Sequence, residues 1–517
     1  AASTPASLRI RDSRNTCGSD LEATRYRAIG RFFDAGQTSL NMIAVGFSLG
    51  LAASVLYLGA IGDHSGRKRL LLLGMGLSIP AALLAAYAWN EAVLVIARIF
   101  GGVCAGMAYP TTLALITALW ADGPERTKAI AKWSAIGSGV MVIGPLTAGW
   151  LLEHFWWGSV FLVTVPLAAI ALLFAWRLIP AHVNETSEPV DNQGGLLSMV
   201  FIASLVLAIN FAPVPNGWGI ALAFAVVAVV SGVLFVRRQR RAENPLYDLT
   251  VVARRIFWVA AVAGMIVFGT LMGTMYIGQQ FMQNVLGYDT LSAGAAVLPA
   301  SIAMVAVAGL SARMVDARGS RATLLLGFLF FLLGFAAMLV LWDVNTPYWA
   351  VALAYMLLGM GVGFAGTPAS HSLTASVPVK RAGMASGTAD LQRDLGGAVM
   401  QSILGALLTV GYGAAIASAV ASSPQSNLVN DEIQTQLQKS YAGAEAVGAQ
   451  YPTYASVIEE AARKAFLEGS NAAYAAGIIA ILIAVAITWF AYPRKQAELE
   501  LVAQYQQEDT QSPTGVR

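Results

Sequence analysis

Long runs of apolar residues, separated by short polar turns, make up most of the chain from about residue 41 onward. Each run approaches or exceeds the roughly 20 residues that an α-helix needs to cross the hydrocarbon core of a bilayer. Thirteen such runs are expected to form membrane-spanning helices, at residues 41–60, 70–88, 93–120, 133–152, 159–176, 196–212, 219–235, 257–281, 294–312, 324–341, 349–368, 383–410 and 472–491.

Basic residues alternate from one turn to the next along these runs. The turns after residues 62, 120, 235, 312, 375 and 491 carry lysines and arginines, whereas those at 90, 153–158, 213–218, 284–292 and 342–348 carry none. Turns rich in lysine and arginine stay on the cytoplasmic side of a membrane. The alternation therefore predicts a multi-pass protein of the plasma membrane, with the turn at residues 63–69 facing the cytoplasm.

Composition excludes several classes of protein. Hydrophobic residues make up 57% of the 517 positions, charged residues make up 12%, and the mean hydropathy is +0.63. The formal net charge of +3 comes from the basic turns and requires no nucleic-acid partner. Cys17, Cys104 and the four histidines show no metal-ligand spacing. No enzyme motif and no phosphate-binding glycine loop occurs, so an ion gradient is the expected energy source and no cofactor is expected.

One turn pattern occurs twice. In both copies an acid is followed by a glycine three residues later, a basic residue two positions after that, and then three leucines and a glycine. The copies lie 316 − 63 = 253 residues apart, and such a repeat indicates a carrier built from two related helical bundles. The matching positions are Asp63, Gly66, Lys68 and 71–74 in the first copy, and Asp316, Gly319, Arg321 and 324–327 in the second.

The two repeated turns are candidate cytoplasmic gating loops. Asp63 can interact with the positive N-terminus of a nearby helix, and Arg67 and Lys68 can reach acids across the interface between the bundles. Each turn would then stabilise the state in which the cytoplasmic side is closed. The alternative is a basic turn that only sets the orientation of the chain.

A single arginine, Arg98, lies inside the expected span at residues 93–120. An arginine facing lipid costs about 3 kcal/mol on insertion scales, so Arg98 is expected to face the bundle interior and to bind an acid or a carbonyl. The alternative is a structural arginine that extends toward the outer end of its helix.

Three charged residues, Asp390, Arg393 and Asp394, interrupt the span at residues 383–410. Asp394 lies roughly 15 Å along the helix from Met384, near the midplane, and Asp390 shares its face at four residues' spacing. An acid at that depth can hold or release a proton according to the side of the membrane that it faces. Arg393 can neutralise one acid, which is the structural alternative, and the second acid then remains available.

A glycine-rich stretch occupies residues 137–149. Glycines one turn apart allow helices to approach closely, and a proline removes a backbone donor and bends the helix. The alternative is ordinary packing of small residues. The positions of interest are Gly139, Gly144, Pro145 and Gly149.

These motifs resemble the major facilitator superfamily, in its fourteen-span drug:proton antiporter branch. The turn at Asp63 resembles the signature loop after the second helix, and Arg98 with the glycines after it resembles the antiporters' second signature, which is implicated there in proton transfer. Residues 137–149 resemble the antiporter-specific signature, although Val140 and Ala148 stand where glycines are usual. Residues 156–166 and 387–397 resemble further stretches of the fourteen-span exporters and of quaternary-ammonium efflux pumps.

The resemblance covers residues 41–493 and implies the fold, the activity and the partners. The fold would be all-α, with two pseudo-symmetric bundles plus two inserted linker helices. The activity would be proton-coupled export of amphipathic, cationic compounds by a monomer in contact with membrane lipids, with Asp390 or Asp394 as counter-charge. One rival is an exporter of a single endogenous metabolite or lipid. The other is a non-transporting membrane protein, because the acidic first helix of the family is not found in residues 1–36.

The expected organisation follows from these spans. The polar residues 1–36 carry six arginines and are expected to be disordered or to form a surface helix without crossing the membrane. The remaining segments are a first bundle at 37–180, a linker with two helices at 181–250, a second bundle at 251–410, an extracytoplasmic loop at 411–470, a last membrane helix at 471–493 and a cytoplasmic tail at 494–517.

Overall fold

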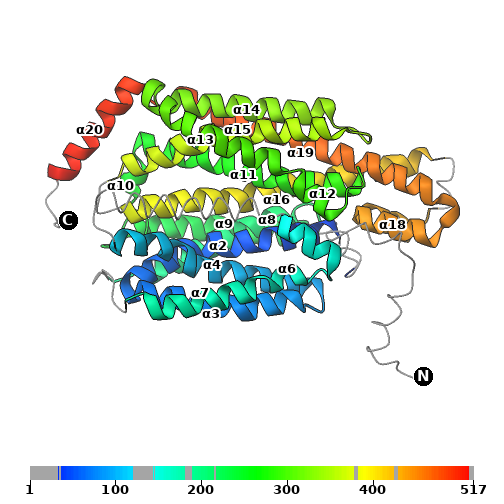
Figure 1. Cartoon of the computed structure of the whole chain (residues 1–517), viewed down its shortest axis with the longest axis horizontal. Helices are drawn as coiled ribbons and strands as arrows, with labels where there is room; N and C mark the ends of the chain where they lie inside the picture. Colours follow the sequence, from blue (N-terminus) through cyan, green and yellow to red (C-terminus); the bar gives the residue numbers. More distant parts are fainter. Residues whose placement is uncertain are drawn as a thin grey trace.

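The computed structural model describes residues 33, 36–119, 144, 146–180, 189–214, 217–377, 382–423 and 429–511. Long helices running side by side make up almost all of this part of the chain (Figure 1). Within it, 12 helices are long and apolar enough to cross a membrane, and each overlaps one of the expected spans. The one expected span without such a helix, at residues 133–152, lies mostly outside the described residues, as does the polar segment at residues 1–36.

The first bundle is built on a close crossing of two helices. A Cβ on Gly50 would collide with the Ile99 carbonyl, and a Cβ on Gly102 would collide with the Phe47 carbonyl, so the absence of side chains lets the two backbones touch. This crossing brings Arg98 against the neighbouring helix. The described helices of this bundle are α2 (Gln37–Ser65), α3 (Arg67–Ala86), α4 (Glu91–Leu119), α6 (Ser159–Leu162) and α7 (Thr164–Leu178), together with helical residues 146–154.

Two linker helices, α8 (Asn192–Phe211) and α9 (Trp218–Gln239), follow the first bundle. The buried carboxylate of Asp191 ties them together. It accepts hydrogen bonds from the Gly194 amide at 3.1 Å, from Arg238 Nε at 2.9 Å and from Gln239 Nε2 at 3.0 Å. The start of α8 is therefore fixed to the end of α9.

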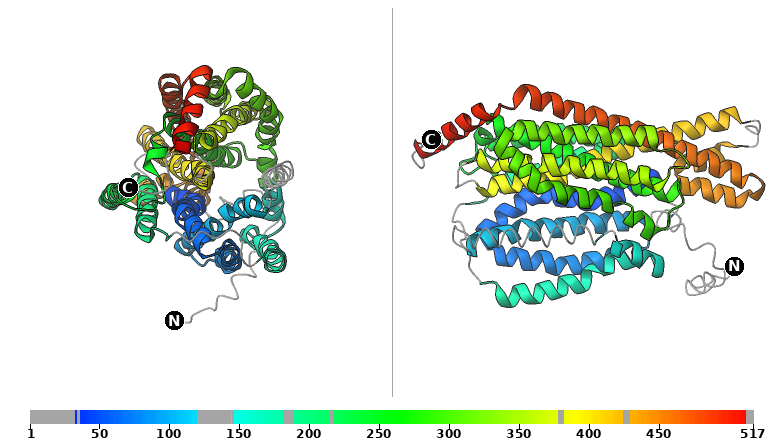
Figure 2. Two further views of the ribbon diagram at one scale, coloured as in Figure 1. Left: turned by 90° about the vertical axis from the view of Figure 1, so that its left-hand side faces the viewer. Right: turned by 45° about the horizontal axis from the view of Figure 1, so that its top comes forward.

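The second bundle surrounds a core of aromatic side chains. Phe281 and Trp342 stack with their ring centroids 4.8 Å apart, and Phe328, Phe331 and Phe335 are fully buried. Figure 2 shows the two groups of helices end-on, and the helix α16 packs against α2 where they meet. The helices of this bundle are α10 (Leu249–Val252), α11 (Arg255–Asn284), α12 (Thr290–Ala295), α13 (Leu298–Arg318), α14 (Ser320–Leu341), α15 (Tyr348–Ala375), α16 (Ala382–Ser422) and α19 (Ala455–Ala491).

Two helices of the second bundle are longer than a membrane requires. α16 has 41 residues and α19 has 37, so both exceed the roughly 30 Å of a hydrocarbon core at about 1.5 Å per residue. Their ends pack with three short elements, α17 (Asp431–Lys439), α18 (Tyr441–Gln450) and the 3₁₀ turn η5 (Pro452–Tyr454). We call residues 411–470 the external subdomain; it protrudes beyond the other helices in Figure 1.

The structure places the helix boundaries here differently from the sequence analysis. The spans were expected to end at residue 410 and to resume at 471, but α16 continues to Ser422 and α19 already begins at Ala455. The physical reason is an apolar core outside the membrane, in which Ile416 and Phe466 are buried. At the opposite end, a last helix, α20 (Lys495–Gln511), follows α19.

Candidate functional site

The three charged residues of α16 lie at the interface between the bundles. The Arg393 guanidinium lies over the Phe268 ring of α11, 5.3 Å from its centroid, and Arg393 Nη1 lies 3.5 Å from the Tyr109 hydroxyl of α4. On its own helix, Arg393 Nη1 lies 3.8 Å from Asp390 Oδ1. The guanidinium therefore contacts both bundles and one of the two predicted acids.

One guanidinium faces two carboxylates in this stretch. The Asp390 side chain is 11% exposed, whereas that of Arg393 is 45% exposed. Asp394 lies one turn further along the helix, and its carboxylate forms no hydrogen bond or ion pair with any residue that the structure describes. Because Arg393 offsets one negative charge, the second acid can take up a proton or a cation.

The orientation of this stretch is fixed from its other face. Gln392 Nε2 donates to the carbonyls of Ala260 at 2.6 Å and Ala261 at 3.1 Å, both on α11. Gly264 leaves room for this amide, because a Cβ there would collide with it. These bonds hold the rotation of α16, and hence the direction in which Asp390 and Asp394 point.

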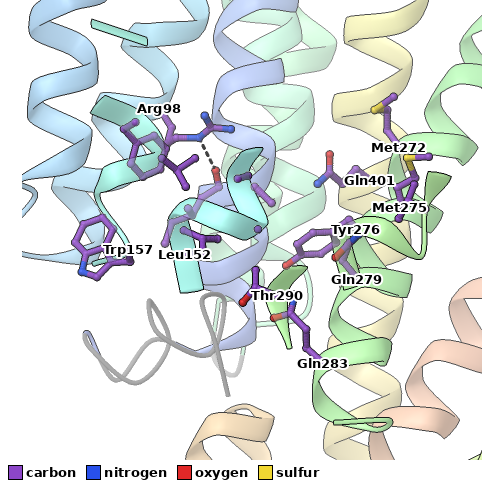
Figure 3. Close-up of a pocket in the computed structure, with 18 residues that line it drawn as sticks. Arg98, Leu152, Trp157, Met272, Met275, Tyr276, Gln279, Gln283, Thr290 and Gln401 are labelled. Atoms are coloured by element: carbon purple, nitrogen blue, oxygen red, sulfur yellow. Dashed lines mark hydrogen bonds between the residues drawn. The ribbon is translucent and has the colours of Figure 1, made fainter. Parts of the chain in front are cut away.

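A cavity of about 410 Å³ lies between the bundles, toward the end opposite the basic turns (Figure 3). We call this end the external end. The walls of the cavity come from α2, α4, α6, α11, α12, α16 and residues 148–152, and Arg98 is the charged residue among the residues that line it. Apolar and aromatic side chains alternate with amides around it, including Trp157, Met272, Gln279 and Gln401. Such a lining suits an amphipathic molecule.

Arg98 projects from α4 into this cavity. Its Nε donates to the Ile43 carbonyl of α2 at 3.2 Å, and its guanidinium lies 5.1 Å from the centroid of Phe47 and 5.7 Å from that of Phe161. A carbonyl and two aromatic faces therefore surround the charge, which lowers the cost of keeping an arginine inside a membrane protein. The role of Arg98 in proton transfer stays a prediction.

The cavity and the acids share one face of α16. Asp394, Gly397 and Gln401 recur at spacings of three and four residues, and Gln401 lines the cavity. Seven residues separate Asp394 from Gln401, which is about 10 Å of helix. The structure therefore brings Arg98 and Gln401 to the cavity and places Asp394 about two turns, and Asp390 about three turns, closer to the basic end.

A buried hydrogen-bond chain joins three helices beside the cavity. The Tyr276 hydroxyl of α11 donates to Asn41 Oδ1 of α2 at 2.7 Å, and Asn41 Nδ2 donates to Thr409 Oγ1 of α16 at 3.2 Å. These bonds hold the two bundles together at the external end. Neither these bonds nor the cavity amides Gln279 and Gln283 were predicted from the sequence. The signal was present, because amides interrupt the apolar run of α11 as Asp390 interrupts that of α16.

Both repeated turns contain a glycine with positive φ. Gly66 has φ 108° and Gly319 has φ 85°, values that glycine adopts without strain. The repeat-related bases also play one role. Lys68 Nζ donates to the carbonyls of Trp176 at 2.9 Å and Ile179 at 2.5 Å, at the end of α7, and Arg321 Nη2 donates to Trp489 O at 2.6 Å, near the end of α19. Each base thus caps the last helix of its own bundle.

This geometry differs from the expectation for the first turn. Lys68 was expected to reach acids across the interface between the bundles, but it binds carbonyls within its own bundle. The physical reason is the negative end of the α7 dipole, whose last carbonyls lack partners within the helix. Arg67 begins α3 and is half-buried. The Asp63 side chain lies outside the described residues.

The second turn is also held by α20. Lys495 Nζ donates to the Asp316 carbonyl at 2.7 Å, and the Ser320 amide donates to Glu498 Oε2 at 3.2 Å. One end of α13 and the start of α14 are therefore capped by neighbouring residues of one helix. This contact was not predicted, because no residue pattern in the sequence marks it.

The glycine-rich stretch is partly described. Gly139 and Pro145 lie outside the described residues. A Cβ on Gly149 would lie 2.9 Å from the Leu291 Cα, so this glycine allows a close approach between the bundles, whereas a Cβ on Gly144 would meet nothing within 4 Å.

Comparison with known proteins agrees with this architecture. Residues 26–401 match the family described as the Major Facilitator Superfamily. The chain is 33% identical to the multidrug efflux pump LfrA of Mycolicibacterium smegmatis over 90% of each protein. It is 30% identical to the methyl viologen resistance protein SmvA of Salmonella typhimurium, over 87% of this chain and 90% of SmvA.

A solved structure supports the fold. The crystal structure of a bacterial homologue of the human lysosomal transporter Spinster, inward-facing and unoccupied, superposes with a TM-score of 0.52 at 16% identity, covering 95% of this chain and 97% of that one. The predicted all-α, multi-pass architecture is thereby confirmed. Its helices, its internal repeat and its family match lead to one conclusion: the chain belongs to the Major Facilitator Superfamily and is a membrane transporter that binds small molecules.

Proposed function

We propose that this protein exports amphipathic, cationic compounds in exchange for protons. The observation that carries the proposal is the charge arrangement on α16, where two acids, Asp390 and Asp394, stand beside one guanidinium, Arg393, which pairs with Asp390 at the interface between the bundles. The names of the similar pumps, multidrug efflux pump and methyl viologen resistance protein, support the substrate class.

Coupling needs only competition for one charge. An acid that holds a proton is neutral and attracts no cation, and an acid that neutralises a cation cannot also hold a proton. If the outward-facing state favours the proton and the inward-facing state favours the cation, each turn of the cycle exchanges one for the other. We assign this exchange to Asp394, whose carboxylate has no ion pair among the described residues. Asp390 pairs with Arg393, and the two together maintain the local charge balance.

The cavity supplies the contacts for the rest of the substrate. Trp157, Met272 and Met275 offer apolar surface, and Gln279 and Gln283 offer hydrogen bonds at its external side. Flexible methionine side chains accommodate ligands of different shape. Arg98 disfavours a cation at the external end, so a cationic substrate leaves this region more easily than it stays.

The remaining parts of the proposal concern energy and assembly. The proton gradient is the energy source, and no cofactor or metal takes part. A single chain contains both bundles, both turns and the interface between them, so the transporter acts as a monomer surrounded by membrane lipids.

The test is dye efflux from cells that express the protein, with and without a collapsed proton gradient. Asp394→Asn should abolish gradient-driven export of cationic dyes while the protein still inserts. Glu500→Gln, which neutralises an exposed carboxylate of α20 away from both cavities, is the control and should export normally. Unchanged efflux in Asp394→Asn, with unchanged dependence on pH, would refute the assignment.

A further inference from the structure

A second cavity lies inside the external subdomain, far from the acids of α16. It has a volume of about 450 Å³, within the range of small-molecule sites. Aliphatic side chains from four elements line it, including Ile416 of α16, Ile433 of α17, Val447 of α18 and Val457 of α19. The described residues thus line an apolar cavity that the proposed transport pathway does not use.

This cavity lies beyond the membrane. Gly387 begins the apolar span of α16, and Ile416 lies 29 residues further on, which is about 44 Å of helix against a hydrocarbon core of about 30 Å. Acyl chains within the bilayer therefore do not reach it. An occupant must arrive from the aqueous external side.

Tyrosines and charge indicate what kind of occupant fits. Tyr451, which is 44% exposed, and the half-buried Tyr454 also line the cavity, and aromatic faces attract cations. None of the described residues that line this cavity is charged, but residues 429–468 around it carry six acids and three bases, a net charge of 3 − 6 = −3, although the whole chain is +3. Two of these acids, Glu459 and Glu460, pair with bases one turn away on α19. The acids are Asp431, Glu432, Glu445, Glu459, Glu460 and Glu468, and the bases are Lys439, Arg463 and Lys464.

We propose that this cavity is an external binding site for organic cations with an apolar body, the class of compound that the protein exports. This inference rests on the proposed function for the identity of the compound. The aliphatic walls bury the apolar body, and the tyrosines and the acidic surface favour the positive charge. A neutral compound of the same shape binds less well, and an anion is repelled.

The site communicates with the pathway through α16. One continuous helix carries Asp394 and Ile416, which are 22 residues apart. The Tyr412 hydroxyl donates to the Leu437 carbonyl at 3.1 Å, so α17 is fixed to the same helix. Compound that accumulates outside therefore binds at the far end of the helix that carries the proposed exchange acid.

The experiment is photoaffinity labelling of the full-length protein in lipid nanodiscs with an azide derivative of tetraphenylphosphonium, followed by peptide mapping. Label is expected on the peptide that contains Tyr451 and Tyr454, and excess tetraphenylphosphonium should remove it. Triphenylphosphine oxide, which is neutral and carries three of the four phenyl rings, should compete at least tenfold less well.

Two variants test the cavity itself. Ile433→Trp fills it from α17, and Val457→Trp fills it from a position that is already exposed and tolerates a larger ring. Both should reduce labelling of the tyrosine peptide at least tenfold, whereas Ile433→Leu should retain it. The proposal would be overturned if the two tryptophan variants were labelled as strongly as the unsubstituted protein. It would also be overturned if the neutral compound competed as well as tetraphenylphosphonium.

Failure of this inference is distinguishable from failure of the proposed function. Asp394→Asn should lose export but keep the external label, because Asp394 lies outside this cavity. Gradient-driven export by a protein without label at the tyrosine peptide refutes the external site alone. Label at that peptide in a protein without gradient-driven export supports the site and refutes the proposed function.

Discussion

The crossing of α2 and α4 gives the sharpest test of how the first bundle is held together. Gly50 and Gly59 lie on the same helix, α2, but have opposite surroundings. A Cβ on Gly50 would collide with the Ile99 backbone carbonyl, whereas a Cβ on Gly59 would meet nothing within 4 Å. We therefore expect Gly50→Ala to be less stable than Gly59→Ala.

The magnitude follows from two terms. Alanine is favoured over glycine within a helix by about 1 kcal/mol, and this gain applies to both variants. At Gly50 the clash is with backbone, which cannot move aside alone, so α2 and α4 must separate, and overpacking of this kind costs about 1–3 kcal/mol. The difference in free energy of unfolding between the two variants is then about 1–3 kcal/mol, with Gly59→Ala the more stable.

The separation should also be visible at Arg98. Its bond to the Ile43 carbonyl, 3.2 Å long, spans the same two helices and is lost when they move apart. Gly50→Ala should therefore lower both the melting temperature of the purified protein and the rate of dye export, whereas Gly59→Ala should lower neither. Equal melting temperatures for the two variants would show that the helices do not touch as the structure describes.

Three other substitutions test the contacts around the cavity and the turns. Lys68→Met removes the cap on α7 and should slow dye efflux at saturating dye with little loss of affinity for the dye, and substitution of the exposed Arg69 by Met serves as the control. Weaker dye binding with intact turnover would instead place the turn in the substrate site. Tyr276→Phe removes a buried hydrogen bond worth about 1 kcal/mol and should raise the outward-open population about fivefold. The measurement is labelling of Gln283→Cys by an impermeant thiol reagent in a Cys17→Ser background. Unchanged labelling would show that this hydrogen bond does not hold the external side closed. Glu498→Gln weakens the cap on α14 and should speed limited proteolysis within α20, whereas substitution of the exposed Glu500 by Gln should not. Equal cleavage of the two variants would show that the cap does not hold α20.

Hydropathy alone located the helices because lipid leaves the backbone no alternative. Each run of about 20 apolar residues must satisfy its own amides and carbonyls, and a helix does so. The same rule fails where the helices leave the membrane. Ile416 and Phe466 are as apolar as lipid-facing residues, but they pack against each other's helices outside the bilayer, so the pattern could not indicate where α16 and α19 end.

In the candidate site, the charged residues could be predicted from the sequence, but their surroundings could not. Arg98, Asp390 and Asp394 could be found from the sequence, because a charge in an apolar run must have a reason to be there. Their surroundings could not be found. The partner of Arg98 is the Ile43 carbonyl of another helix, and every residue has a carbonyl, so no residue type marks it. Gln401 likewise becomes informative only once α16 is placed against the cavity.

The two repeated turns have one contact in common and differ in a second. Lys68 and Arg321 each cap the last helix of their own bundle. The second turn is also held by Lys495 and Glu498 of α20, which cap α13 and α14 and fix this turn within its own bundle. A latch between the bundles requires a turn that changes partners during the cycle. The second turn, which α20 holds in addition to the contact of Arg321 with α19, is therefore poorly suited to that role.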